Sequence, residues 1–186
     1  MSAPSDPREY ARVARRSRTL LSGGGAVDDS IPELADADPD LLGIAIATVE
    51  GVTRASAQAD ALISIQSAVK PFLFALALRD HGPDALDRVG IEPTGEAFDA
   101  IKLESGTGRP PNPMVNAGAL LTAALVDGAD AASRSERILD GLSAFAGRDL
   151  SVSESIAESE HLLGDRNHAL AHLMRSEGTL DIGADD

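Results

Sequence analysis

The sequence predicts a mixed α and β fold in which a β-hairpin near the N-terminus is followed by a series of helices. The hairpin is indicated at 41–57, where two apolar runs flank a Glu50-Gly51 turn signal. Helices are indicated further along the chain, where apolar residues recur at helical spacing. Aromatic residues make up only 3% of the 186 residues, so we expect a core of Leu, Ala, Val and Ile in a single domain.

The first element expected is a helix from about 7 to 22. Asp6 before Pro7 forms a cap followed by a proline at the first helical position, and apolar residues then follow a helical spacing. The glycine triplet 23–25 stops this helix and lacks the rest of a phosphate-binding fingerprint. We therefore expect an N-terminal helix and glycine hinge over 1–25, and the main domain over 26–186.

Beyond the hairpin, a short strand is expected at Ile63–Ile65. The apolar positions of 71–79 and 117–126 are nearly continuous, which predicts two helices that are buried on most sides and form the core. Further helices are expected at 133–146, 152–163 and 166–177. Two or three strands do not make an independently stable sheet, so the architecture is expected to be incomplete.

Composition excludes several kinds of chemistry. The chain has no cysteine, which removes disulfides, thiolate nucleophiles and cysteine-bound zinc, and leaves a hydroxyl, an amine or a carboxylate as the nucleophile. A formal charge of −14 argues against nucleic acid and membranes as partners. The sequence contains no apolar run long enough for a membrane span or a signal peptide, and we expect a cytoplasmic location.

The segment SIQSAVKP at 64–71 holds the clearest candidate for catalysis. A serine hydroxyl becomes nucleophilic when a neighbouring base takes its proton, and a lysine can be that base when burial lowers its pKa. Ser67 and Lys70 are three residues apart and share one face of a helix, whereas Ser64 would point to nearly the opposite side. The dipole of a helix N-terminus would favour a serine alkoxide and a developing oxyanion.

The same residues also have a purely structural interpretation, as polar residues at the start of a core helix. Pro71 disfavours helical geometry at Lys70 and suits a helix that begins at position 71. An SxxK spacing is common in proteins, so these four residues alone do not establish catalysis.

Four blocks of sequence extend the argument: SIPELADADPDLLGIAIATVEG, SIQSAVKP, GRPPNPMVNAGAL and ESEHLLGDRNHALAHLM. In order and spacing they resemble the serine-dependent glutaminase family over roughly residues 26–180. The resemblance implies a β-lactamase/transpeptidase-like fold and the hydrolysis of L-glutamine to L-glutamate and ammonia. It implies no metal or organic cofactor. From it we also expect a homo-oligomer.

The resemblance assigns roles to five residues. Ser67 matches the nucleophile, which also contacts the substrate, and Lys70 matches its partner in the SxxK pair. Asn116, Glu160 and Asn167 match substrate-binding positions. Their chemistry suits a free amino acid, because a carboxylate can hold the ammonium group and an amide can both donate and accept hydrogen bonds.

Each of the last three residues keeps a structural alternative. Asn116 could cap the helix that begins with AGALL, and Asn167 could cap the helix HALAHLM. Glu160 near a helix end could be a solvated charge.

The chain departs from the family in two ways. The family block DYIPELA carries a tyrosine where this chain has Ser30, whose hydroxyl is shorter and less acidic, and the only tyrosine, Tyr10, is no obvious substitute. Family members also continue for about a hundred residues beyond this point, through an oxyanion-hole strand whose loss costs about 10²–10³ in rate. A truncated product, completion by a partner or tight dimer, and loss of catalysis are the three explanations we consider.

The sequence leaves two other functions open. A non-catalytic remnant that binds glutamine or acts as an interaction module is favoured by Ser30 and the short C-terminus. The retention of all five matched residues argues against it: Ser67, Lys70, Asn116, Glu160 and Asn167. A penicillin-recognising hydrolase also uses SxxK, but the chain has no SDN or KTG element.

Overall fold

The chain divides after Ser64 into two packing units, Met1–Ser64 and Ile65–Asp186. The computed structural model describes residues 7–21, 25–51, 53–56 and 58–181. The predicted boundary between an N-terminal segment and a main domain at residue 25 stays a prediction. The boundary between the two packing units lies at residue 64. Every candidate site residue from Ser67 onward belongs to the second unit.

The first unit contains two helices and a hairpin. Its elements are α1 (Pro7–Leu21), α2 (Pro32–Ala35), β1 (Ala45–Ala47) and β2 (Thr53–Ala55). The predicted helix over 7–22 is confirmed, whereas its Asp6 cap and most of the glycine hinge lie outside the described residues. The short helix α2 was not predicted. It begins with Pro32, whose fixed backbone angle suits a first helical turn.

The predicted hairpin is confirmed. Strand β1 pairs antiparallel with β2, with Ile46 opposite Arg54. The turn uses Gly51, whose φ of 80° lies in the left-handed region that favours glycine, and its N–H donates to the carbonyl of Thr48 over 3.0 Å.

The strand predicted at Ile63–Ile65 is wrong. Residues 61–65 have no regular structure, and the only sheet in the described part of the chain pairs β1 with β2. A run of β-branched residues forms a strand only where a neighbouring strand offers hydrogen bonds, so intrinsic preference alone did not decide this segment.

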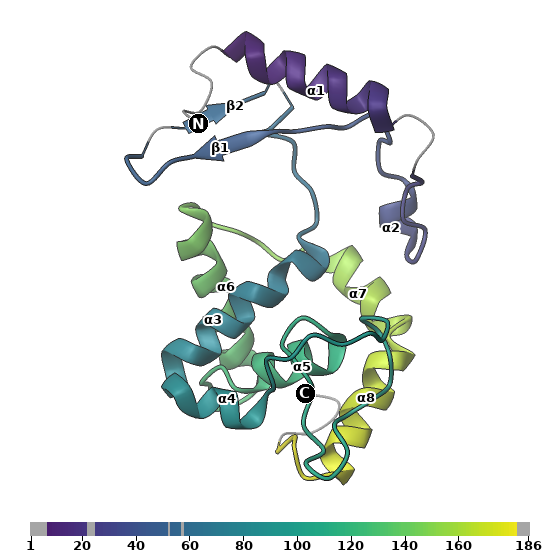
Figure 1. The fold of residues 1–186 in the computed structure, drawn as a ribbon, viewed down its shortest axis with the longest axis vertical. Coiled ribbons are helices and arrows are strands. Elements are labelled where there is room, and N and C mark those ends of the chain that lie inside the picture. Colours follow the sequence, from purple (N-terminus) through teal and green to yellow (C-terminus); the bar gives the residue numbers. More distant parts are fainter. Residues whose placement is uncertain (1–6, 22–24, 52, 57, 182–186) are drawn as a thin grey trace. The chain divides into compact units, whose positions relative to one another are not determined.

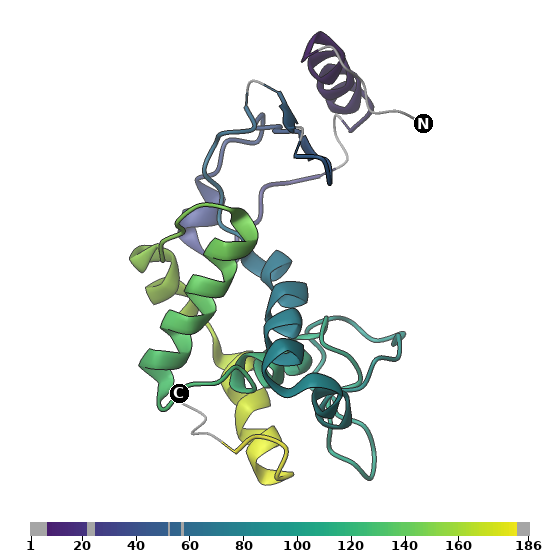
Figure 2. The same ribbon diagram turned by 90° about the vertical axis from the view of Figure 1, so that its left-hand side faces the viewer.

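The second unit is built from helices, and Figures 1 and 2 show their course. The α-helices are α3 (Lys70–His81), α4 (Ala85–Arg88), α5 (Asn116–Ala124), α6 (Ala131–Ala146), α7 (Glu154–Leu162) and α8 (Asp165–Ser176), with 3₁₀ turns η1 (Gln66–Val69) and η2 (Gly82–Asp84). The five predicted helices of this region are confirmed with small shifts of their ends. The turn η2 and helix α4 were not predicted.

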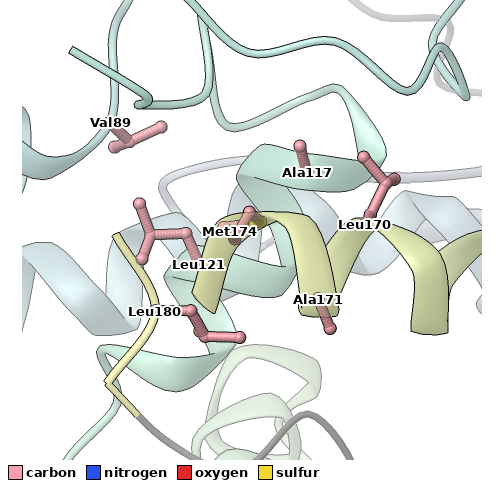
Figure 3. Packing of buried hydrophobic residues seen from close by; sticks show 7 residues of the cluster. All are labelled: Val89, Ala117, Leu121, Leu170, Ala171, Met174 and Leu180. Atoms are coloured by element: carbon pink, nitrogen blue, oxygen red, sulfur yellow. The ribbon is translucent and has the colours of Figure 1, made fainter. Parts of the chain in front are cut away.

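The core of the second unit lies where α5 packs against α3 and α8. Figure 3 shows its buried cluster: Val89, Ala117, Leu121, Leu170, Ala171, Met174 and Leu180. The expected core of aliphatic side chains is confirmed, with Met174 added. The prediction that 71–79 and 117–126 are buried core helices is confirmed, since α3 buries Leu73, Leu76 and Ala77. Helix α8 adds three residues to the cluster of Figure 3.

An ion pair between a buried carboxylate and a partly exposed arginine joins α3 to α6. The side chain of Asp80 is 2% exposed and accepts hydrogen bonds from Arg137 Nη2 at 2.5 Å and Nε at 3.2 Å. The backbone N–H of Asp127 donates to the same carboxylate over 3.0 Å. Two donors from one guanidinium fix the direction of the pair, so this contact sets how α6 lies along α3.

Candidate active site

Ser67 and Lys70 lie at the junction of η1 and α3. Ser67 is the second residue of η1, and Lys70 is the first residue of α3. Side chains three residues apart eclipse one another in a 3₁₀ turn, so the two residues share one face. Lys70 has helical backbone angles, φ −53° and ψ −47°, even though Pro71 follows it. Pro71 was expected to disfavour helical geometry at Lys70, and the structure overrides this preference. Proline fits here because an N–H in the first turn of a helix has no partner within the helix.

The residue before Ser67 has an unusual backbone. Gln66 has a φ of 45°, the only positive φ of a non-glycine residue in the described part of the chain. Such a conformation is costly for a residue with a side chain, and it concentrates at functional sites. It turns the chain sharply as it enters η1 and leaves Ser67 exposed to solvent.

Lys70 is buried and points to α5. Only 7% of the residue is exposed, and its Nζ donates a 2.7 Å hydrogen bond to Oδ1 of Asn116. Burial disfavours the charged form and lowers the pKa of Lys70 below the ordinary lysine value. A lysine in this state gives up its proton more readily, as a base next to a serine requires. No hydrogen bond joins Lys70 to Ser67, both of which the structure describes.

Asn116 connects Lys70 to α8. Its Nδ2 donates to Oδ1 of Asn167 over 3.1 Å. The Asn116 oxygen accepts from Lys70, and its amide nitrogen is left to face Asn167. The structure thus brings Lys70, Asn116 and Asn167 together from three different helices, α3, α5 and α8.

The cap alternatives for the two asparagines do not match the structure. The N-cap positions of α5 and α8 are Val115 and Gly164, and neither helix has a side-chain cap. Asn112 provides the local turn instead, because its Oδ1 accepts from the N–H groups of Met114 at 3.0 Å and Val115 at 3.2 Å. Asn116 and Asn167 are consequently free of a capping role and bond to each other.

The glycine of NPMVNAG allows a close approach that places Asn116. A Cβ atom on Gly118 would lie 1.9 Å from the carbonyl oxygen of Asn112. Any larger residue would therefore push the 112–115 segment away from the start of α5. This packing fixes the backbone immediately before Asn116.

Two residues of the site, Phe98 and Arg166, were missed by sequence reasoning. The ring centroid of Phe98 lies 5.2 Å from Lys70 Nζ, and the carbonyl of Phe98 accepts from the Asn116 N–H over 2.8 Å. Arg166 donates from Nη2 to the carbonyl of Asp99 over 2.9 Å. The position of Arg166 directly before Asn167 was a usable signal. The sequence held no signal for Phe98, because this residue lies in an irregular loop that is remote in sequence from Lys70 on α3 and Asn116 on α5.

The remaining predicted residues are not part of this network. Glu160 is exposed on α7, and no hydrogen bond or ion pair joins it to Lys70, Asn116 or Asn167. Ser30 lies in the first unit, where its N–H donates to Asp28 over 2.8 Å. The Tyr10 side chain lies outside the described part of the chain.

A cavity of about 240 Å³ lies elsewhere in the second unit. Its lining includes Ala97, Lys102 and Val115 but none of the five predicted site residues. The lysine–asparagine network therefore does not line this hollow. In the described residues, no group of three or more His, Asp or Glu side chains is arranged to hold a metal ion, and no helix there is long and apolar enough to cross a membrane.

The helices of the second unit bring a buried lysine and two amides into one hydrogen-bonded network. Comparisons with known proteins identify the class to which this arrangement belongs. The sequence model of the Glutaminase family matches residues 25–186. The chain belongs to the Glutaminase family.

Relatives of known sequence are similar over most of the chain. A glutaminase of Clavibacter michiganensis subsp. michiganensis is 72% identical over 164 residues, which are 88% of this chain and 50% of that protein. A glutaminase of Nostoc sp. is 48% identical over 158 residues, which are 84% of this chain and 47% of that protein. The chain thus spans about half the length of these relatives.

Solved structures agree. Mglu in its tris and glutamate form has a TM-score of 0.87 and 42% identity, covering 100% of this chain and 41% of that one. The probable glutaminase ybaS has a TM-score of 0.87 and 33% identity, covering 96% of this chain and 59% of that one. The predicted fold class, mixed α and β of the β-lactamase/transpeptidase-like kind, is confirmed by these neighbours.

Proposed function

We propose that this chain carries the nucleophile and most of the substrate contacts of a glutaminase, which hydrolyses L-glutamine to L-glutamate and ammonia. The observation that carries the proposal is the buried Lys70, one 3₁₀ turn from Ser67 and hydrogen-bonded to Asn116. Support comes from the 72% identity with the Clavibacter glutaminase and from the glutamate form of Mglu.

The proposed reaction begins at Ser67. Neutral Lys70 takes the hydroxyl proton while the serine oxygen attacks the side-chain amide carbon of glutamine. The proton passes to the amide nitrogen, ammonia leaves, and a glutamyl ester remains on Ser67. Water then attacks the ester with Lys70 again as the base, and glutamate is released.

Among the described residues we assign one hydrogen-bond donor for the oxyanion that forms during the reaction. The backbone N–H of Ser67 is placed at the N-terminal end of η1 and α3, where the helix dipole favours a developing oxyanion. The other donor and a phenol in place of Ser30 would come from outside the described residues or from a partner.

For substrate binding we propose Ser67, Asn116, Asn167 and Glu160. The amide pair on α5 and α8 offers donors and acceptors in one place, which suits a ligand with a carboxylate and an amide. Glu160 is exposed on the helix immediately before α8, and its carboxylate is available for the ammonium group of an amino acid.

Three further expectations remain proposals. We propose that the chain associates with itself, which is supported by large exposed apolar side chains such as Leu162 and Leu163. Sedimentation velocity of the purified chain measures this association. A cytoplasmic location and independence from cofactors follow from the sequence argument, and chelator treatment of an active preparation tests the second.

Ammonia release from L-glutamine tests the function. We expect Ser67→Ala and Lys70→Met to abolish release, while Ser64→Ala and Lys102→Met retain most of it. Ser64 is the serine rejected on helical spacing, and Lys102 is the only other lysine in the chain. Unchanged release in Ser67→Ala would rule out the mechanism, and no release by the unmodified chain would favour a non-catalytic role.

A further inference from the structure

The loop that carries Phe98 is attached to the candidate site at two consecutive residues. The Asn116 N–H, at the start of α5, donates to the Phe98 carbonyl over 2.8 Å. Arg166, at the start of α8, donates to the Asp99 carbonyl over 2.9 Å and pairs with the Asp99 carboxylate at 3.4 Å. Helix α5 therefore holds Phe98, and helix α8 holds Asp99.

These attachments matter because nothing regular supports the loop. Residues 89–115 contain neither helix nor strand. Backbone hydrogen bonds between its two arms, from Gly90 N–H to Pro110 at 2.9 Å and from Glu92 N–H to Pro111 at 3.2 Å, hold it closer to its ends. At Phe98 and Asp99 only the contacts from α5 and α8 fix the backbone to the helices.

The Phe98 ring is placed with little help from packing. The residue is 63% exposed, yet its ring lies over the ammonium of Lys70 at 5.2 Å. An exposed aromatic residue in an irregular loop adopts several orientations unless its backbone is held. The Phe98 backbone is held by the Asn116 N–H at its own carbonyl and by Arg166 at the next residue, Asp99.

We propose that Arg166 is a positioning residue: by clamping Asp99 it holds the Phe98 ring over Lys70 and the Phe98 carbonyl on the Asn116 N–H. Its neighbour Asn167 bonds the Asn116 side chain, so α8 fixes both the backbone and the side chain of Asn116 through consecutive residues. The effect of Arg166 on catalysis rests on the proposed function. Its effect on the position of the Phe98 ring does not.

The charges around Lys70 are consistent with a clamp that works through position. Asp99 and Arg166 are paired with each other, α5 carries no ionisable side chain, and Arg137 of α6 is paired with Asp80 at a later turn of α3. Asp165 and His168 are the other titratable groups at the start of α8. Exposed ion pairs contribute little to stability, so loss of Arg166 should leave the chain folded.

A lysine-specific measurement tests the clamp directly. The chain has two lysines, so protein labelled with [ε-¹³C]lysine gives two ε-methylene signals, and Lys102→Arg assigns them. Protons over an aromatic face resonate upfield. We expect Arg166→Gln to move the Lys70 proton signal downfield, and Phe98→Leu to move it at least as far. Arg175→Gln, on the exposed end of α8, is the matched control and should leave it unchanged.

Two comparisons make the result decisive. In a Phe98→Leu background, Arg166→Gln should cause no further shift, because the ring it positions is gone. Asp99→Ala removes the other half of the ion pair and should reproduce the effect of Arg166→Gln. Urea titrations show whether each variant is folded, and the test uses the folded variant if the other one folds poorly. An unmoved Lys70 signal in folded Arg166→Gln, or a shift of the same size without the ring, overturns the proposal.

The catalytic consequence is measured separately. We expect Arg166→Gln to lower kcat by about 10- to 100-fold, since a small displacement of a catalytic group has effects of that size, with a smaller change in KM. If Arg166 had only a structural role, Arg166→Gln would change the urea midpoint. It would not lower kcat more than it changes KM. If the unmodified chain releases no ammonia, the proposed function fails while the lysine signals still decide the clamp.

Discussion

The ammonium group of Lys70 donates a 2.7 Å hydrogen bond to the side-chain oxygen of Asn116 across the contact between α3 and α5. This bond gives the buried lysine its polar partner, and Asn167 gives Asn116 its own partner. A buried amine therefore keeps a neutral companion in place of a carboxylate, which leaves its pKa lowered by burial.

The neutral charge of Asn116 is predicted to matter. Asn116→Asp places a carboxylate at hydrogen-bond distance from Lys70, and an opposite charge favours the protonated lysine. We expect the pKa of Lys70 to rise and ammonia release near neutral pH to fall at least tenfold, with partial recovery at higher pH. A pH profile of kcat measures this, and Asn112→Asp is the control on the same segment. An unchanged profile would mean that Lys70 is not the titrating base.

The lowered pKa of Lys70 also predicts a pH dependence of stability. The folded chain loses this proton at a lower pH than the unfolded chain, so the unfolded chain binds more protons between the two values. The contribution of Lys70 to the free energy of unfolding is therefore most unfavourable below the folded pKa and improves as pH rises through it. Urea titrations of the unmodified chain and Lys70→Met should diverge most at pH values below the folded pKa of Lys70 and converge as the pH rises through that pKa. Parallel curves would contradict the assignment.

The ion pair between α3 and α6 stabilises the folded chain, and this contribution also increases with pH, but over the acid range in which Asp80 titrates. Burial alone would raise the pKa of Asp80, but hydrogen bonds from Arg137 and the Asp127 N–H, together with the charges of Arg137 and Arg79, lower it. The stability it supplies is present above the unfolded pKa and is lost as pH falls through the folded pKa. Asp80→Asn should lower the free energy of unfolding by about 1–3 kcal/mol near neutral pH, and by less in acid.

The control for this change is Asp140→Asn, on the exposed side of α6. It should leave the urea midpoint nearly unchanged. Equal effects of the two substitutions would show that the ion pair has no special role in holding α6.

The fold was predictable where local pattern and tertiary packing agree. Apolar spacing located α5 and α8, and the Glu50-Gly51 signal located the hairpin, because each depends on neighbours close in sequence. The strand predicted at Ile63–Ile65 failed because a strand depends on a partner that local preference does not supply. The helical geometry at Lys70 was obscured because propensity does not describe a 3₁₀ entry to a helix.

The site was predictable in part. The types and spacing of Ser67, Lys70, Asn116 and Asn167 could be read from motifs, and the structure brings the last three into one hydrogen-bonded chain. Glu160 was named from the same blocks, and its role stays a prediction. Phe98 could not be found, because its position depends on how an irregular loop is anchored to two helices.

The core between α5 and α8 is predicted to control folding of the second unit. Leu170 is fully buried in the cluster of Figure 3, and its truncation leaves a cavity that the packed helices fill only partly. Leu170→Ala should cost about 2–5 kcal/mol of unfolding free energy. Leu162→Ala, with 69% of the residue exposed, should cost little. Urea titrations of both variants measure the two free energies of unfolding. If Leu170→Ala cost less than Leu162→Ala, the core would have to lie elsewhere.

The central claim is that Ser67 forms the covalent bond to substrate. The most direct test is rapid mixing with L-glutamine, acid quenching and mass spectrometry of the peptide that contains Ser67. We predict a mass increase of one glutamyl group, localised to Ser67 by fragmentation and absent from Ser67→Ala. A glutamyl group on another residue, or ammonia release by Ser67→Ala at the rate of the unmodified chain, would contradict the claim.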